Sequence, residues 1–301
     1  MSTESIWYRQ PTKLSIPRLA SYQDVENFLQ SNFTGGYPVL VSSGRSAISL
    51  VIRLFWHQPT ISLFKFASQC VVNACLINQV SPTTHIDSKE DVVYNQWGYA
   101  APNVKSGSFI EDSCDYFKPL GSKVRELNSR FEIWSITKIL GTRAGGVIWC
   151  KNESDARKLR LERSSISSLN LKTLLKASLP KLPFLYRYWE LLELKNPTLS
   201  KWQIGAIYKS MLLWSREWDD RSSRVSDLIK NLQKLGYSGK IMKENEILTG
   251  NLIPTVIVIN GGRNVPQYPG IQAHVINKYS KPRRVLIIPY LSKQYIQNNG
   301  R

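Results

Sequence analysis

The sequence predicts an α/β protein with a mixed, mostly parallel sheet and a small C-terminal α+β lobe. Short apolar runs with strand character alternate with helix-like segments in the first half of the chain, which is typical of α/β layers. A long helical pattern over 199–235 then precedes two further apolar runs. A chain of 301 residues can form a large and a smaller domain. We expect a large domain over 1–196, a small one over 197–301, and packing of segment 1–33 on the small lobe.

The first half of the chain contains most of the expected sheet. The strands expected from apolar runs are 39–41, 61–66, 80–86, 91–94, 108–110, 131–134 and 146–150. The helices expected from apolar spacing are 21–32, 44–56, 68–76 and 151–162. Ser43 is a suitable N-cap for the second of these helices. Its apolar residues nearly encircle it, so we expect this helix to be buried.

The second half is less regular. The pattern over 199–235 predicts one long helix or two. Apolar runs predict strands at 252–259 and 284–288, whereas 260–283 contains three prolines and is expected to be a loop. Repeats and low-complexity tracts are absent from the sequence.

The composition favours a packed protein of the cytoplasm. Hydrophobic residues make up 42% of the chain, and none of the apolar runs reaches the roughly 18 residues that a membrane span needs. The first residues lack the charged and apolar regions of a signal peptide. The four cysteines (Cys70, Cys75, Cys114 and Cys150) form no CxxC pair, which is typical of reduced, buried thiols.

The chain carries a formal charge of +18, from 40 basic and 22 acidic side chains. This excess attracts anions, and nucleic acid, an acidic membrane surface and phosphorylated small molecules are the candidates. The basic residues are spread out, with modest clusters at 151–163, 216–234 and 278–284, and no aromatic-basic RNA motif accompanies them. Nucleic acid is therefore not favoured as the main partner. His57, His85 and His274 are scattered, so no metal site is expected.

A lysine-containing turn carries the clearest chemical signal. Lys138 lies between two expected strands, and Gly145 and Gly146 follow it. Asp112 ends an apolar run 26 positions before the lysine. Pyridoxal 5′-phosphate (PLP) needs a lysine for its Schiff base and an acid at its pyridine nitrogen. The alternatives are a surface lysine in a hairpin turn and a strand-end aspartate that caps a helix.

A second signal lies at the corner between the first expected strand and its helix. Gly44, Arg45 and Ser46 begin that helix. Backbone N–H groups at a helix start bind phosphate with the help of the helix dipole, and a guanidinium can add a further grip. The alternative is an ordinary helix N-cap.

Together these motifs resemble the PLP-dependent aminotransferase superfamily of the aspartate aminotransferase fold. Within it, the sequence is most similar to the DegT/DnrJ/EryC1/StrS sugar aminotransferases. The resemblance runs from about residue 36 to 163 and more faintly to about 291. It implies a three-layer α/β/α large domain of the type I PLP enzymes, PLP as cofactor, and a homodimer.

The resemblance also implies roles for individual residues. Lys138 takes the position of the Schiff-base lysine, and Asp112 that of the acid at the pyridine nitrogen. The residues matched to phosphate binding are Gly44, Arg45, Ser46, Ser135 and Arg143. Phe66 matches the aromatic that stacks on the ring, and Asn95 could bond the ring oxygen. Trp97 is matched to packing or substrate stacking, and Asn196 to the asparagine that reaches the partner's site.

The implied activity is transfer of an amino group from glutamate to a keto-sugar attached to a nucleotide. Lys138 would move protons as general base and acid. Three positions differ from the family pattern, namely Arg45, Asp115 and Thr198. Together with a C-terminal lobe that is shorter than expected for the family, they favour a second class of function, a catalytically reduced relative that acts as a binding or partner subunit. A nucleic-acid-binding protein is a third class. The sugar, the amino donor and the stereochemistry stay open.

Overall fold

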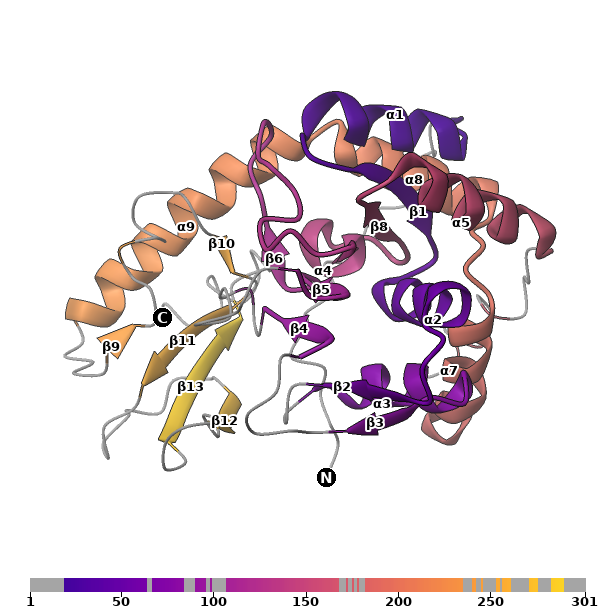
Figure 1. Cartoon of the computed structure of the whole chain (residues 1–301). Helices are drawn as coiled ribbons and strands as arrows, with labels where there is room; N and C mark the ends of the chain where they lie inside the picture. Colours follow the sequence, from indigo (N-terminus) through magenta and orange to yellow (C-terminus); the bar gives the residue numbers. More distant parts are fainter. Residues whose placement is uncertain are drawn as a thin grey trace.

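A mixed β-sheet forms the centre of the larger part of the molecule in the computed structural model (Figure 1). The structure describes residues 19–63, 67–83, 90–95, 98, 107–167, 182–234, 240–241, 253–254, 256–260, 271–275 and 283–289, and positions 172, 175, 178 and 245. The strands of the first half are β1 (Tyr37–Val41), β2 (Thr60–Ser62), β3 (Ser81–Thr83), β4 (Val92–Tyr94), β5 (Ile110–Asp112), β6 (Tyr116–Phe117), β7 (Phe131–Ser135) and β8 (Gly146–Cys150).

The central sheet has the strand order β1-β8-β7-β5-β4. β4, β5 and β7 are parallel, whereas β8 is antiparallel to both of its neighbours, so β1 runs in the direction of β7. An isolated parallel bridge between Leu63 and Val92 joins β4 to the parallel pair β2–β3. The expected α/β fold with a mixed, mostly parallel sheet is confirmed.

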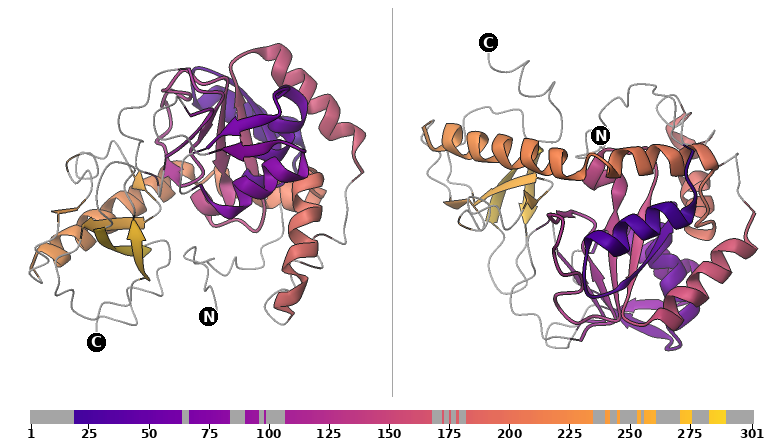
Figure 2. Two further views of the ribbon diagram at one scale, coloured as in Figure 1. Left: turned by 60° about the horizontal axis from the view of Figure 1, so that its bottom comes forward. Right: turned by 90° about the horizontal axis from the view of Figure 1, so that it is seen from above.

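Helices cover both faces of this sheet (Figures 1 and 2). The helices are α1 (Tyr22–Asn32), α2 (Gly44–Phe55), α3 (Gln69–Ile77), α4 (Ile136–Leu140), α5 (Glu153–Ser165), the 3-10 turn η2 (Pro183–Leu185), α7 (Tyr186–Lys195), α8 (Lys201–Met211) and α9 (Trp214–Lys234). The predicted helices of the first half are all present, within about three residues of the expected ends.

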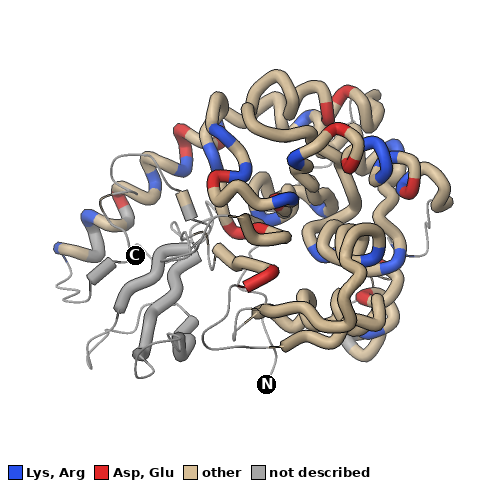
Figure 3. Tube along the Cα trace, viewed as in Figure 1, with Lys and Arg blue, Asp and Glu red and all other residues tan. Residues whose placement is uncertain are grey.

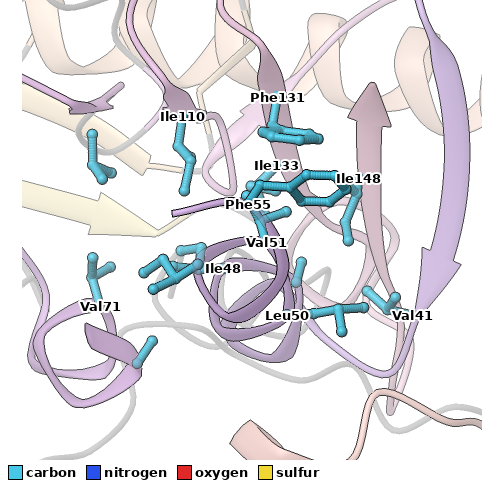
Figure 4. Close-up of a cluster of buried hydrophobic side chains, with 14 of the residues drawn as sticks. Val41, Ile48, Leu50, Val51, Phe55, Val71, Ile110, Phe131, Ile133 and Ile148 are labelled. Carbon is cyan, nitrogen blue, oxygen red and sulfur yellow. The ribbon is translucent and has the colours of Figure 1, made fainter. Parts of the chain in front are cut away.

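Alternation along the strands produces the three layers. In β8, Ile148 packs with α2 and α3 in one core cluster, whereas Val147 and Trp149 pack with α1 and α8 in the other. In β7, Ile133 and Trp134 divide in the same way. Successive side chains of a strand point to opposite faces, so both faces must be covered when both are apolar. Figure 4 shows the first of these clusters.

The C-terminal part adds a second sheet. Its strands are β9 (Lys240–Ile241), β10 (Ile253–Pro254), β11 (Val256–Asn260), β12 (Ile271–Val275) and β13 (Arg283–Pro289). The four-stranded sheet has the order β12-β13-β11-β9, and α9 extends along it (Figure 2). β10 instead pairs with β6, which ties this part of the chain to the turn after β5.

The second half differs from the sequence expectation at three places. The pattern over 199–235 forms two helices, α8 and α9. The expected loop at 260–283 was wrong in part, because β12 pairs with β13 there and the three prolines lie outside the strand. Helix α7 was not predicted. Its exposed aromatic residues, among them Tyr188, obscure the apolar spacing on which a helix prediction depends.

The domain boundary at 196 stays a prediction. α8 packs against α1 and α4, and Ile204, Ile207 and Met211 join the core cluster that contains Trp134. The first part of the proposed small domain therefore shares a core with the central sheet.

That shared core depends on a cluster of four aromatic side chains. The ring of Phe33 meets the edges of Trp134, Trp149 and Trp214 at centroid distances of 5.1, 5.9 and 5.3 Å. These rings come from the end of α1, from β7, from β8 and from the start of α9. Edge-to-face pairs add stabilisation beyond that of buried area.

We expect Phe33→Ala to lower the free energy of unfolding by about 3–5 kcal/mol, because it leaves a cavity among three tryptophans. The matched control is Phe184→Ala, since Phe184 is 70% exposed and its loss should change stability by less than about 0.5 kcal/mol. Denaturant midpoints measure both variants. Equal losses in the two variants would contradict the role given to this cluster.

Candidate active site

The candidate site lies at the carboxyl edge of the parallel strands. β4 and β5 end at Tyr94 and Asp112, which are register partners, and β7 ends at Ser135 in the adjacent strand. Ligands of open α/β sheets bind outside the carboxyl ends of the strands. Asp112 and Ser135 therefore lie at the edge of the sheet where proteins of this fold class bind their ligands.

Lys138 reaches this edge from α4. The sequence predicted a polar turn between two strands, and the structure has a helix of five residues between β7 and β8. The helix ends at Gly141, whose φ of 68° is left-handed. Lys138 Nζ lies 2.5 Å from Asp115 Oδ1, and 26% of the lysine side chain is exposed. The lysine side chain is thus partly exposed, and its amine is paired with a carboxylate.

Asp115 is fully buried behind the lysine. Its second oxygen accepts a hydrogen bond from the hydroxyl of Tyr94 at 2.6 Å. Burial would lower the pKa of Lys138, but the carboxylate of Asp115 outweighs it and raises that pKa above the usual value for lysine. Burial and the same carboxylate also raise the pKa of Tyr94. Sequence analysis treated Asp115 only as a departure from the family pattern, and it missed Tyr94 although Tyr94 ends a predicted strand.

Asp112 is buried at the end of β5. One of its oxygens accepts a hydrogen bond from the backbone N–H of Cys114 at 3.1 Å. Burial raises the pKa of Asp112, the hydrogen bond from Cys114 opposes the rise, and the charge of Asp115 adds to it. A positive charge that arrived beside Asp112 would favour its ionised form.

The start of α2 lies against the same strand ends. A Cβ atom on Gly44 would stand 2.5 Å from the sulfur of Cys114 and 3.5 Å from Cβ of Ser135. The expected N-cap is confirmed, because the hydroxyl of Ser43 accepts from the backbone of Ser46 and the hydroxyl of Ser46 accepts from the backbone of Ser43. The helix N-terminus, with its positive dipole end, is thus beside the ends of β5 and β7.

Arg45 extends from this helix start toward α7. Its guanidinium donates to the hydroxyl of Tyr186 at 3.1 Å, lies 3.6 Å from Glu190 and stacks 4.8 Å from the ring centroid of Trp189. Sequence reasoning missed these three partners together with α7. Arg45 is held by this helix, so a phosphate near the start of α2 would compete with Glu190 for it.

The other sequence candidates are placed in different surroundings. Ser135 is buried at the end of β7 and caps α4 without a side-chain hydrogen bond, while Arg143 is exposed after α4. The amide nitrogen of Asn95 donates to Glu111 at 3.1 Å and to Ser113 at 2.9 Å. Phe66 and Trp97 lie outside the described residues.

Asn196 is buried near the start of α2 in its own chain. Its amide donates to the carbonyl of Ser167 at 3.0 Å, and its side-chain oxygen accepts from the backbone of Thr198 at 3.0 Å. Its own carbonyl accepts from the hydroxyl of Ser42 at 3.1 Å. In this conformation the side chain closes a turn before α8, and its contact with a partner's site stays a prediction.

An amine, a buried acid and a helix N-terminus thus meet at one sheet edge, which is the donor set of a PLP enzyme of this fold class. A family model described as "Putative PLP-dependent aminotransferase" matches residues 25–245, more than half of the chain. The chain belongs to this family, and it is an enzyme family whose cofactor is PLP. None of the curated proteins matches the sequence.

Solved structures share the fold at low identity. A Bacillus cereus protein of the same description has 15% identity and a TM-score of 0.55, over 81% of this chain and 71% of that one. A DegT DnrJ EryC1 StrS aminotransferase from Brucella abortus has 12% identity and a TM-score of 0.55, over 91% and 88%. Helicobacter pylori PseC, an aminotransferase of pseudoaminic acid biosynthesis, has 12% identity and a TM-score of 0.56, over 94% and 91%. The expected aminotransferase fold is confirmed.

Within the described ranges, the helices are too short or too polar to cross a membrane. In the same ranges, no three His, Cys, Asp or Glu residues gather as metal ligands would.

A buried carboxylate next to the site has an unusual titration. Glu111 packs beside Glu132, and Lys118 lies 3.2 Å from Glu132 and 3.4 Å from Glu126. Burial and the repulsion of Glu132 raise the pKa of Glu111 from 4.5 to about 7, although Lys118 opposes this rise. The folded protein therefore retains a proton on Glu111 that the unfolded chain releases between these pH values. The contribution of Glu111 to the free energy of unfolding therefore falls as the pH rises from 4.5 to about 7.

We expect Glu111→Gln to remove most of this fall, because the amide does not titrate. At pH 8 the variant should be more stable than the natural protein by roughly 1–3 kcal/mol, and near pH 4 the two should be similar. Glu126→Gln is the matched control, since the Glu126 side chain is 55% exposed and also meets Lys118. Denaturant midpoints measured from pH 4 to pH 8 report the stability of all three proteins. The same pH dependence of stability in all three would contradict the raised pKa of Glu111.

Proposed function

We propose that Lys138 binds PLP covalently and that Asp112 faces the pyridine nitrogen of the cofactor. The observation that carries this proposal is the meeting of Lys138, Asp112 and the start of α2 at one sheet edge. A lysine amine, a buried acid and a helix N-terminus match the aldehyde, the ring nitrogen and the phosphate of PLP. The residues present therefore fit the cofactor.

The residues of the site would divide the chemistry between them. When bound, PLP withdraws electrons from the substrate carbon that carries the amino group. Lys138 would take a proton from that carbon and return it elsewhere, as general base and then general acid. Asp112, as a carboxylate, would hold the proton of the ring nitrogen. The start of α2 would bind the phosphate, with Ser135 beside it.

We further propose that glutamate donates the amino group and that a nucleotide-linked keto-sugar accepts it. The charge of +18 supports an anionic substrate, because such a field raises the local concentration of anions. Lys and Arg are spread over the described helices, mixed with Asp and Glu (Figure 3). The fold shared with the Brucella protein and with PseC also supports a sugar substrate.

Three further features belong to the same proposal. They are a homodimer with small-molecule substrates, a cytoplasmic location, and a division into a cofactor-binding domain over 1–196 and a small domain over 197–301. The scattered cysteines support the location.

A second candidate is a catalytically reduced relative that serves as a binding or partner subunit. The ion pair between Lys138 and Asp115 favours it, because an amine held as an ammonium cannot attack an aldehyde. Reaction of the bound cofactor with an amino donor separates the two candidates, because the reduced relative would bind PLP without carrying out either half-reaction.

We expect Lys138→Ala to abolish covalent binding of PLP, because the variant lacks the amine of the Schiff base. Borohydride reduction followed by peptide mass spectrometry should place the cofactor on Lys138 in the natural protein. Lys151→Ala, at an exposed position after β8, is the control and should bind PLP normally. Attachment to another lysine in the natural protein would refute the assignment.

We expect glutamate to convert the bound cofactor to its amine form, and a nucleotide-linked keto-sugar to reverse that change. The visible absorbance of the cofactor reports both half-reactions. A keto acid such as 2-oxoglutarate is the matched acceptor, because it returns the amino group without a sugar. Faster reversal by simple keto acids than by every sugar nucleotide would refute the proposed acceptor. A bound cofactor that reacts with none of the amino donors would favour the reduced relative.

A further inference from the structure

The ion pair at the site suggests a role for Asp115 that goes beyond cofactor contact. Lys138 comes from α4 and Asp115 from the turn between β5 and β6, and their charged atoms are 2.5 Å apart. The carboxylate is fully buried, whereas 26% of the lysine side chain is exposed. The pair therefore joins a fully buried carboxylate to a lysine whose side chain is partly exposed.

Tyr94 fixes the carboxylate in this position. Its hydroxyl donates to the second oxygen of Asp115 at 2.6 Å, and Tyr94 itself is held at the end of β4 by the register with Asp112. A buried carboxylate with both oxygens engaged costs more to move than one that is free to rotate. The partner of Lys138 is therefore a fixed feature of the sheet edge.

The other titratable groups close enough to act on Lys138 are Asp112 and Cys114, at and just after the end of β5, and Cys70 in α3. Burial raises the pKa of Cys114 well above its usual value, so this thiol stays neutral near pH 7. Asp115 is consequently the dominant partner of the ammonium.

We propose that Asp115 is a positioning residue that holds Lys138 as an ammonium in the cofactor-free protein and so slows covalent capture of PLP below alkaline pH. The proposal rests on the proposed function, because it takes Lys138 as the lysine that binds PLP. Only the neutral amine has the lone pair that attacks an aldehyde carbon. The ammonium must first release a proton, and the contact with Asp115 opposes that release.

The reactivity of Lys138 in the cofactor-free full-length protein tests this inference without any enzymatic activity. Acetic anhydride acylates neutral amines, and peptide mass spectrometry reports its rate at each lysine as a function of pH. Lys151, which is exposed, is the internal reference. We expect the midpoint for Lys138 in the natural protein to lie above that of Lys151 by about one pH unit or more.

Asp115→Asn should accelerate labelling of Lys138 at least about tenfold near pH 8 and lower its midpoint, because the amide keeps the shape and removes the charge. Asp112→Asn is the matched control, since it removes a second carboxylate near Lys138, and it should have a smaller effect than loss of the ion-paired Asp115. An unchanged rate and midpoint in Asp115→Asn, or an equal effect of Asp112→Asn, would overturn the inference. If Asp115→Asn does not fold, the natural protein decides, because a Lys138 midpoint at or below that of Lys151 would also overturn it.

The same preparations distinguish this inference from the proposed function. Incubation with PLP and borohydride should attach the cofactor to Lys138 faster in Asp115→Asn than in the natural protein. Attachment to Lys138 at equal rates in both would overturn the role of Asp115 and leave the proposed function standing. Absence of attachment in both would refute the proposed function, whereas the acylation profiles would still report on the ion pair.

Discussion

The close approach of two glycines to the start of α2 holds the candidate site together. The N–H of Gly145 donates to the carbonyl of Ser42 at 2.7 Å, and the carbonyl of Gly145 accepts from Thr137 in α4. A Cβ atom on Gly146 would stand 2.3 Å from the carbonyl carbon of Ser43, a distance that no side chain could occupy. Gly145 also has a φ of 120°, which favours glycine. This backbone contact sets the lysine helix beside the helix N-terminus.

The second constraint on the site is its balance of charge. The chain is strongly basic, yet two buried carboxylates, those of Asp112 and Asp115, act on Lys138. Burial makes each additional negative charge costly, which is why the pKa of Asp112 is raised and why Asp115 is paired with the lysine. The lysine is therefore held as an ammonium in an ion pair, and it must lose a proton before it can act as a nucleophile.

The sequence predicted the fold well where local pattern and tertiary burial agree. The all-round apolar pattern of α2 predicted burial, and Ala47, Ile48 and Val51 are at most 1% exposed. Ser43 was predicted as an N-cap because capping depends on neighbours three positions away. By contrast, β12 exists through its pairing with β13, and such a long-range partner leaves little trace in a run of residues interrupted by prolines.

The candidate site was predicted only in part, for the same physical reason. The spacing of Lys138 from Gly145 and Gly146 indicated the lysine, and the end of an apolar run indicated Asp112. Both signals are local, so the sequence alone could show them. The partners that determine the chemistry of these residues are not local. Tyr94 in β4 bonds to Asp115, which follows the neighbouring strand β5. Arg45 pairs with Glu190 of α7, which lies 145 positions later in the chain.

These long-range partners also bear on how an anionic ligand could be accepted. The field of a basic surface draws anions toward the molecule, but the buried acids would repel them at the sheet edge. The structure offers two ways to reduce this repulsion. Asp115 is neutralised by its ion pair with Lys138, and Glu111, whose pKa is raised to about 7, is partly protonated near neutral pH. The start of α2 then attracts phosphate through its helix dipole, and Arg45 adds to this attraction to the extent that phosphate displaces Glu190 from it. Loss of the ammonium at Lys138 would leave Asp115 uncompensated, so the charge on this one lysine couples the reactivity of the amine to the affinity of the site for anions.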